Sequence, residues 1–158
     1  MEYPEHHVLI VSRLDYAIRT VLEDEGGIAP GRITEVKSVD DAVEALDELA
    51  AKGIGVGAII YYLDIVKDRD VQFWLLMQNV RARQQPLPVI VMSMYNSSER
   101  VQTRDGQVKQ PVISVAGALT NEGVYAHLPI DAPPKILSGW VKSALEDYAT
   151  NIRRSGSQ

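Results

Sequence analysis

The chain has 158 residues, a net charge of −5 and no cysteine. This length suits one domain with a sizeable core, for which hydrophobic residues make up 46% of the sequence. The lack of cysteine excludes disulfides, thiolate metal sites and cysteine nucleophiles, and the acidic balance argues against general nucleic-acid binding. Because no apolar run reaches membrane-spanning length and the N-terminus lacks a secretory signal pattern, we expect a cytoplasmic protein.

Strand-like and helix-like apolar patterns alternate along the chain. In order, the expected elements are a strand at Val8–Val11, a helix ending at Gly26-Gly27, a strand at Ile33–Val36, a helix capped at Ser38 and ended by Gly53, a strand at Val56–Leu63, a helix at Val71–Arg83, strands at Leu87–Met92 and Val124–Leu128, and a helix starting near Pro133-Pro134. This alternation is typical of a parallel sheet covered by helices on both faces. With right-handed crossovers it predicts a doubly wound α/β fold, a five-stranded parallel sheet in the order 2-1-3-4-5.

Most aromatic residues are expected to pack in the core. The last helix carries an apolar stripe at helical spacing, formed by Ile136, Leu137, Trp140, Val141, Ala144, Leu145 and Tyr148. Tyr61, Tyr62 and Trp74 are also assigned to the core, because buried packing is the commoner role of such residues.

Glycine and histidine residues that resemble ligand sites are assigned structural roles. The run Gly53-x-Gly55-x-Gly57 precedes a strand, whereas a dinucleotide-binding loop follows one, so it indicates a helix stop and a turn. His6-His7 is expected at the surface, because no further metal ligand has suitable spacing. His127 stands alone in a strand, and a structural role is expected for it.

The alternation is interrupted at Tyr95–Glu122, the stretch in which the regular pattern would have a fourth helix. Asp105-Gly106 lies between Val101–Arg104 and Gln107–Gln110, which is a strong short-range signal for a β-hairpin. Pro111 would also disrupt a helix that crossed it. We therefore predict an irregular segment with a hairpin in place of helix four; a surface loop is the alternative. One domain is expected over residues 1–152, with a disordered polar tail at 153–158.

These elements together resemble the receiver domain of bacterial response regulators, a CheY-like and flavodoxin-like fold, over about residues 6–150. Asp64 follows the third strand, Ser93 ends the fourth, and Tyr125 and Pro129 belong to the fifth. The resemblance implies that Asp64 occupies the phospho-acceptor position and Ser93 the Ser/Thr position. It also places Tyr125 at the aromatic switch position, and Pro129 at the proline that usually follows a cis bond.

This sequence differs from the receiver family at the positions of the family's catalytic residues. Ser12 and Arg13 stand where receivers carry the acidic pair that holds Mg²⁺, and Leu128 stands where they carry a lysine that contacts the phosphoryl group. A neutral hydroxyl and a cation are poor replacements for two carboxylate ligands. The resemblance is thus to an atypical receiver, or pseudo-receiver, with no metal and no cofactor. Arg13 is expected to point toward Asp64, because a buried carboxylate needs a partner.

The leading functional hypothesis is a non-catalytic signalling module that binds protein independently of phosphorylation. Its interaction face is expected at the switch side of the fold, formed by Tyr125, Trp140, Arg100, Arg104, Asp105 and Gly106. The partner would be a signalling protein or a second copy that forms a homodimer. One alternative is a working phospho-receiver with Asp64 as acceptor, in which Asp15 or Asp68 helps to hold the ion. The other is a flavodoxin-like small-ligand binder that uses the crevice at the strand ends.

Overall fold

The computed structural model describes residues 6–12, 18–63, 71–83, 87–93, 101–102, 108–109, 124–129 and 132–156. Its strands are β1 (His7–Val11), β2 (Ile33–Val36), β3 (Val56–Leu63), β4 (Val89–Ser93), β5 (Val101–Gln102), β6 (Val108–Lys109) and β7 (Ala126–Pro129). Its α-helices are α1 (Ile18–Asp24), α2 (Val39–Ala51), α3 (Val71–Arg81) and α5 (Pro134–Gly156), and a 3₁₀ turn spans Pro30–Arg32. None of the described helices is long and apolar enough to cross a membrane.

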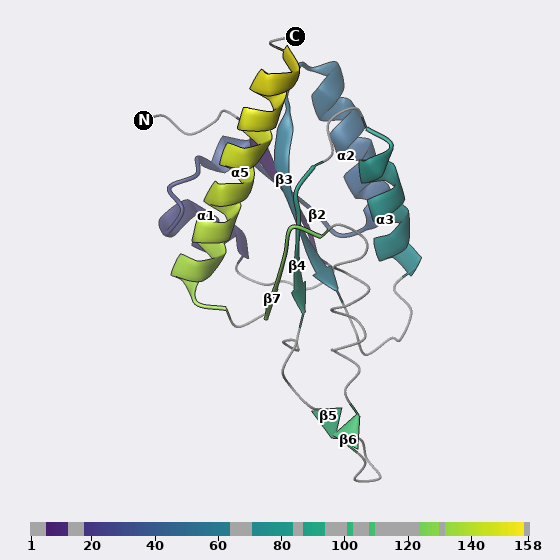
Figure 1. The fold of residues 1–158 in the computed structure, drawn as a ribbon, viewed down its shortest axis with the longest axis vertical. Coiled ribbons are helices and arrows are strands. Elements are labelled where there is room, and N and C mark those ends of the chain that lie inside the picture. The colour runs from purple at the N-terminus through teal and green to yellow at the C-terminus, as the bar shows by residue number, and fades with distance from the viewer. Residues whose placement is uncertain are drawn as a thin grey trace.

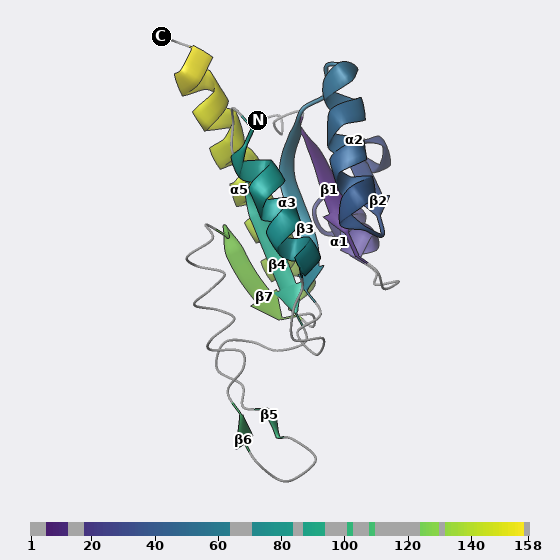
Figure 2. The ribbon, with the colours of Figure 1, turned by 90° about the vertical axis from the view of Figure 1, so that its right-hand side faces the viewer.

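The main sheet has five parallel strands in the order β2-β1-β3-β4-β7. Helices α2 and α3 cover one face of the sheet, and α1 and α5 cover the other (Figures 1 and 2). The order corresponds to 2-1-3-4-5, so the predicted doubly wound fold is confirmed. Both faces are apolar, as parallel sheets require when helices cover them on both sides.

Alternate residues of each strand supply two separate core layers. Leu9 and Ile59 pack against α2 and α3, whereas Ile10 and Ile60 pack against α1 and α5. All four side chains are fully buried. The period of two along a strand therefore divides one continuous apolar run between two cores.

The predicted start and end of α2 are both present. Ser38 is the N-cap residue, and its Oγ accepts a hydrogen bond from the backbone N–H of Asp41 at 3.1 Å. Gly53, just after the helix, has a φ of 75°, which favours glycine. At the two later positions of the run, glycine is needed because neighbouring side chains pack closely. A Cβ on Gly57 would lie 2.7 Å from His6 Cβ and 2.9 Å from Leu145 Cδ2. The run is structural, as predicted.

Some residues assigned to the core are exposed instead. Trp74 is 42% exposed, Ile136 49% and Trp140 40%. The buried face of α3 consists of Phe73, Leu76, Met77 and Val80, so Trp74 lies one residue outside an i, i+3, i+4, i+7 stripe. On α5 the stripe is likewise narrower than predicted, because only one side of the helix faces the sheet.

The prediction of a surface position for His6 and His7 was wrong. Both are half-buried, and the His6 ring packs edge-on against Tyr148 with 5.1 Å between ring centroids. The reason is that His6 packs against Gly55 and Gly57, where it fills the space that side chains at these two positions would take.

The predicted hairpin is supported by its two strands. β5 and β6 pair antiparallel, with Val101 opposite Lys109 and Gln102 opposite Val108, and the pair lies beyond the carboxyl-terminal ends of the main strands (Figure 1). Asp105-Gly106 and most of the segment expected to replace helix four lie outside the described residues. The last helix continues to Gly156, past residue 152 where the sequence placed the end of the ordered domain. No cis peptide bond occurs among the described residues, so none precedes Pro129.

Candidate functional site

Three of the residues singled out in the sequence lie along the carboxyl-terminal edge of the sheet. Ser12 directly follows β1, and its N–H donates to the Val36 carbonyl oxygen at 3.0 Å. In the strand register, Leu63 lies beside Ser93, and Met92 lies beside Leu128. Ser12, Ser93 and Leu128 therefore stand along one edge, as the resemblance implied. Asp64, Arg13, Asp15 and Asp68 lie outside the described residues, so the pairing of Arg13 with Asp64 stays a prediction.

This edge is apolar at Leu128, near the end of β7. Leu128 is only 7% exposed and packs in the core layer that faces α1 and α5. Ser12 is 5% exposed and offers a hydroxyl rather than a carboxylate. Within the described part of the chain, no three His, Asp or Glu side chains come together as metal ligands would. Leu128 cannot supply positive charge to a phosphoryl group.

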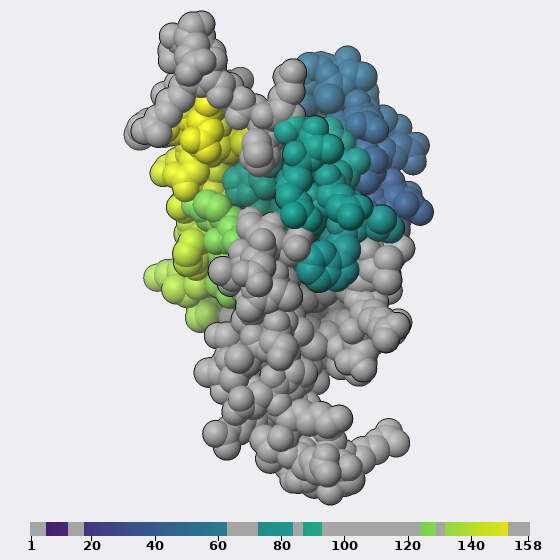
Figure 3. Space-filling view, turned by 45° about the vertical axis from the view of Figure 1, so that its right-hand side comes forward, coloured from purple at the N-terminus to yellow at the C-terminus, as the bar shows by residue number. Residues whose placement is uncertain are grey.

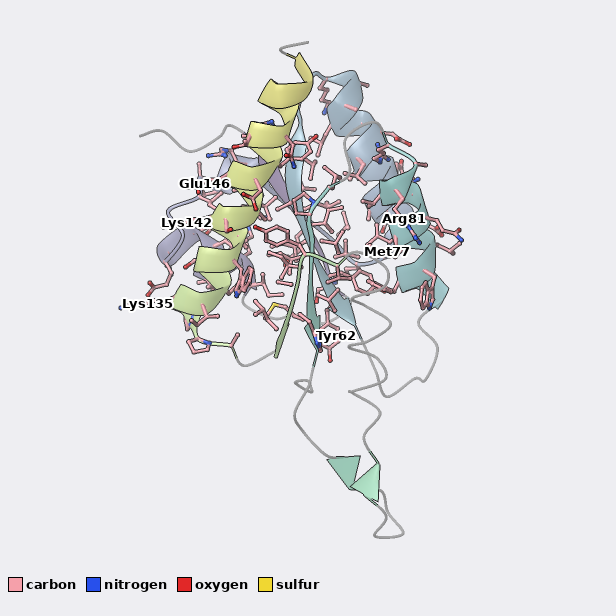
Figure 4. The ribbon with its side chains drawn as sticks, in the orientation of Figure 1. Tyr62, Met77, Arg81, Lys135, Lys142 and Glu146 are labelled. Carbon is pink, nitrogen blue, oxygen red and sulfur yellow. The ribbon has the colours of Figure 1, made fainter. Side chains whose placement is uncertain are left out.

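A small hollow opens at the same edge, between β1, β3 and the start of α2. It is lined by Val11, Lys37, Ser38, Val39, Tyr61 and Tyr62. Figure 4 shows Tyr62 at this end of the sheet. The hollow measures about 10 Å³, which is space for roughly one water molecule.

Sequence reasoning did not connect Lys37 and Tyr62 with this edge. Lys37 directly follows β2, which pairs with β1 in parallel register, and Tyr62 lies next to the last residue of β3. The signal was available in principle, because residues that follow parallel neighbouring strands share one edge of the sheet.

The second group of predicted residues lies where β7 meets α5. The backbone N–H of Tyr125 donates to the Val89 carbonyl oxygen at 2.8 Å. Its hydroxyl donates to Asp147 Oδ2 at 2.6 Å and lies 2.8 Å from Ser143 Oγ. The ring meets Trp140 edge-on, with 5.9 Å between centroids and an interplanar angle of 87°. Tyr125 is thus fixed to α5 at its ring and at its hydroxyl.

The electrostatics of this group keep the tyrosine protonated. Burial raises the pKa of Tyr125, and the hydrogen bond to Asp147 raises it further. A protonated hydroxyl can donate to the Asp147 carboxylate, which is a charge-assisted and therefore strong hydrogen bond.

Ser143 and Asp147 were missed by sequence reasoning. They follow Trp140 by three and seven residues, so the three side chains lie on one face of α5. That spacing was visible, but nothing in the sequence linked it to a tyrosine on β7. Arg100, Arg104, Asp105 and Gly106, which were assigned to the same face, lie outside the described residues.

No known family model matches the chain, and no curated protein matches it. Solved structures do match. The signal receiver domain of a Luxo repressor protein from Vibrio parahaemolyticus aligns with a TM-score of 0.64 at 19% identity, over 93% of this chain and 95% of that one. A response regulator from Chloroflexus aurantiacus aligns at 0.59 and 19% identity, over 89% of this chain and 98% of that one.

A third similar structure is a pilus assembly-related protein from Burkholderia pseudomallei. It aligns with a TM-score of 0.62 at 14% identity, over 92% of this chain and 93% of that one. Identities this low show a common fold and nothing more. The chain therefore has the fold of response-regulator receiver domains.

Proposed function

We propose that this chain is a non-catalytic signalling module, a pseudo-receiver that acts by binding protein without being phosphorylated. The observation that carries the proposal is the burial of Leu128 in the core at the end of β7. Phosphoryl transfer depends on positive charge placed around the transferred group. A buried leucine in place of the lysine removes one such charge, and Ser12 in place of a carboxylate weakens a metal site.

The clamped Tyr125 supports the same proposal. In the family that this chain resembles, the residue at this position is the aromatic switch. Here the hydroxyl is held by Asp147 and Ser143, and the ring packs on Trp140. Releasing it would break this hydrogen bond and separate the two rings. The face that β7 and α5 form is therefore suited to a constant contact rather than a switched one.

The exposed apolar residues on α5 suit a protein partner. Trp140 is 40% exposed and Ile136 is 49% exposed, one helical turn apart. Tryptophan is among the residues most enriched at the centres of protein interfaces. The partner is a signalling protein or a second copy of this chain. One structural neighbour is a pilus assembly-related protein, so proteins of that kind also use this fold.

The first experiment tests for phosphorylation. The protein is incubated with Mg²⁺ and acetyl phosphate for intact-mass analysis, and with Mg²⁺ and beryllofluoride for amide NMR spectra. We expect no added phosphoryl mass and no saturable shifts at Ser12 or around Asp64. A phosphorylated species that disappears in Asp64→Asn would show a working phospho-receiver instead.

The second experiment tests the binding face with matched tryptophan variants. Trp140→Ala and Trp74→Ala remove side chains of similar exposure, 40% and 42%, from different helices. Partner capture and self-association should weaken at least tenfold in Trp140→Ala, as for an interface hot spot, and stay unchanged in Trp74→Ala. Deleting residues 100–110 should weaken the same interaction while the core stays folded. Equal behaviour of the two tryptophan variants would refute the assignment of the face.

A further inference from the structure

A second, larger hollow lies at the opposite, amino-terminal edge of the sheet. It measures about 240 Å³ and lies where the end of α2, the starts of β3 and β4, and the last part of α5 converge. Figure 2 shows α5 and α2 on either side of β3 at this end of the molecule. The described residues that line the hollow are Leu46, Ala50, Ile54, Gly55, Val56, Arg83, Leu87 and Tyr148. A cavity of about 150 Å³ accommodates benzene, so this space admits an aromatic ring with a short side chain.

Arg83 places a fixed positive charge at the hollow. Its Nε and Nη2 donate to Asn79 Oδ1 at 3.0 and 2.9 Å, and Nη2 also forms an ion pair with Asp47 at 3.1 Å. These contacts hold the guanidinium in one orientation, while its Nη1 donates to no described residue. An arginine fixed in this way suits a planar carboxylate, since its remaining N–H groups already point in a set direction.

Tyr148 supplies a second donor. It is only 9% exposed, and its ring is held by His6. A phenol hydroxyl can donate one hydrogen bond, and this one is not among the fully buried polar atoms of the described residues that lack a partner. Burial raises the pKa of Tyr148, and the nearby Arg83 offsets only part of this rise. A phenol and a guanidinium therefore line one mainly apolar hollow.

We propose that this hollow binds a small organic carboxylate with a flat apolar body, such as an aryl-substituted acid. The apolar part would lie against Leu46, Val56 and Leu87, and the carboxylate would accept from Arg83 Nη1 and the Tyr148 hydroxyl. The ion pair with Asp47 does not block this, because the Asp47 side chain is 68% exposed at the rim. The site lies at the edge of the sheet remote from Leu128, so it stands independently of the proposed signalling function.

The test uses phenylacetate and its neutral analogue phenylacetamide as probes in amide NMR titrations of the full chain. We expect saturable shifts in the residues that line the hollow, with a dissociation constant for phenylacetate on the order of 1 mM. Phenylacetamide should bind about tenfold more weakly, because it lacks the charge. No saturable shift with phenylacetate up to roughly 10 mM would overturn the proposal.

Matched variants identify the donors. Arg83→Gln should weaken phenylacetate binding about tenfold or more, and Tyr148→Phe should weaken it severalfold while keeping the ring in place. Arg81→Gln is the control: Arg81 is the last residue of α3 (Figure 4), two positions before Arg83, and does not line the hollow. Thermal melts confirm that each variant is folded. Equal affinity in Arg83→Gln and Arg81→Gln would refute the assignment.

Discussion

Replacing Leu128 with lysine places an ammonium group near the end of β7, and the structure indicates what this costs in stability. Leu128 is 7% exposed at the end of β7, next to Met92 of β4. The substitution forfeits the burial of a leucine, worth about 1.5–3 kcal/mol. It also brings an ammonium group that must reach water along its own stem. We expect the free energy of unfolding to fall by about 2–4 kcal/mol.

Urea unfolding followed by tryptophan fluorescence measures this loss, and thermal melts give a second estimate. For a chain of this size the expected fall in Tm is roughly 5–15 °C. Leu128→Met is the control, because it conserves volume and should cost less than about 1.5 kcal/mol. The midpoint should shift while the denaturant slope stays constant, which identifies a change in stability rather than in compactness.

The reasoning would be refuted by a Leu128→Lys variant within about 0.5 kcal/mol of the original protein, the range of ordinary surface substitutions. Such a result would mean that the end of β7 is open to solvent and able to present a lysine at the strand ends. The proposal that this edge is a structural core rather than a phosphoryl site would then fail.

Gly57→Ala should lower the free energy of unfolding by about 1–3 kcal/mol, because its Cβ would meet the His6 Cβ at 2.7 Å. Gly55→Ala meets only the end of that imidazole, at 3.0 Å, and should cost clearly less; equal urea midpoints for both variants would contradict the packing argument. Stability should also depend on pH, since burial lowers the pKa of His7 and of His127 below 6.5, and Arg32 lowers that of His7 further. Near and below pH 6.5 the unfolded chain then binds more protons than the folded protein. The free energy of unfolding should therefore be full above that pH and fall as the pH drops toward about 5. A flat profile of unfolding free energy in this window would contradict the burial of both rings.

The sequence by itself determined the sheet and its order. Apolar runs such as Val56–Leu63, alternating with helix patterns, leave few topologies once crossovers are short and right-handed. It also predicted the Ser38 cap and the hairpin strands around Asp105-Gly106, because capping and turn chemistry act over a few neighbouring residues.

The tertiary structure alone decided which residues become available at the surface and at the two edges of the sheet. Residue type placed Trp74 in the core, and helical spacing placed Trp140 on an apolar stripe. The width of the buried stripe depends, however, on how closely each helix meets the sheet (Figure 3 shows α3 between α2 and α5). The contact of Tyr125 with Asp147 joins residues far apart in the chain. The hollow beside Arg83 likewise exists only where α2, the start of β3 and α5 converge. Such features come from non-local packing, and local patterns in a sequence carry no direct record of it.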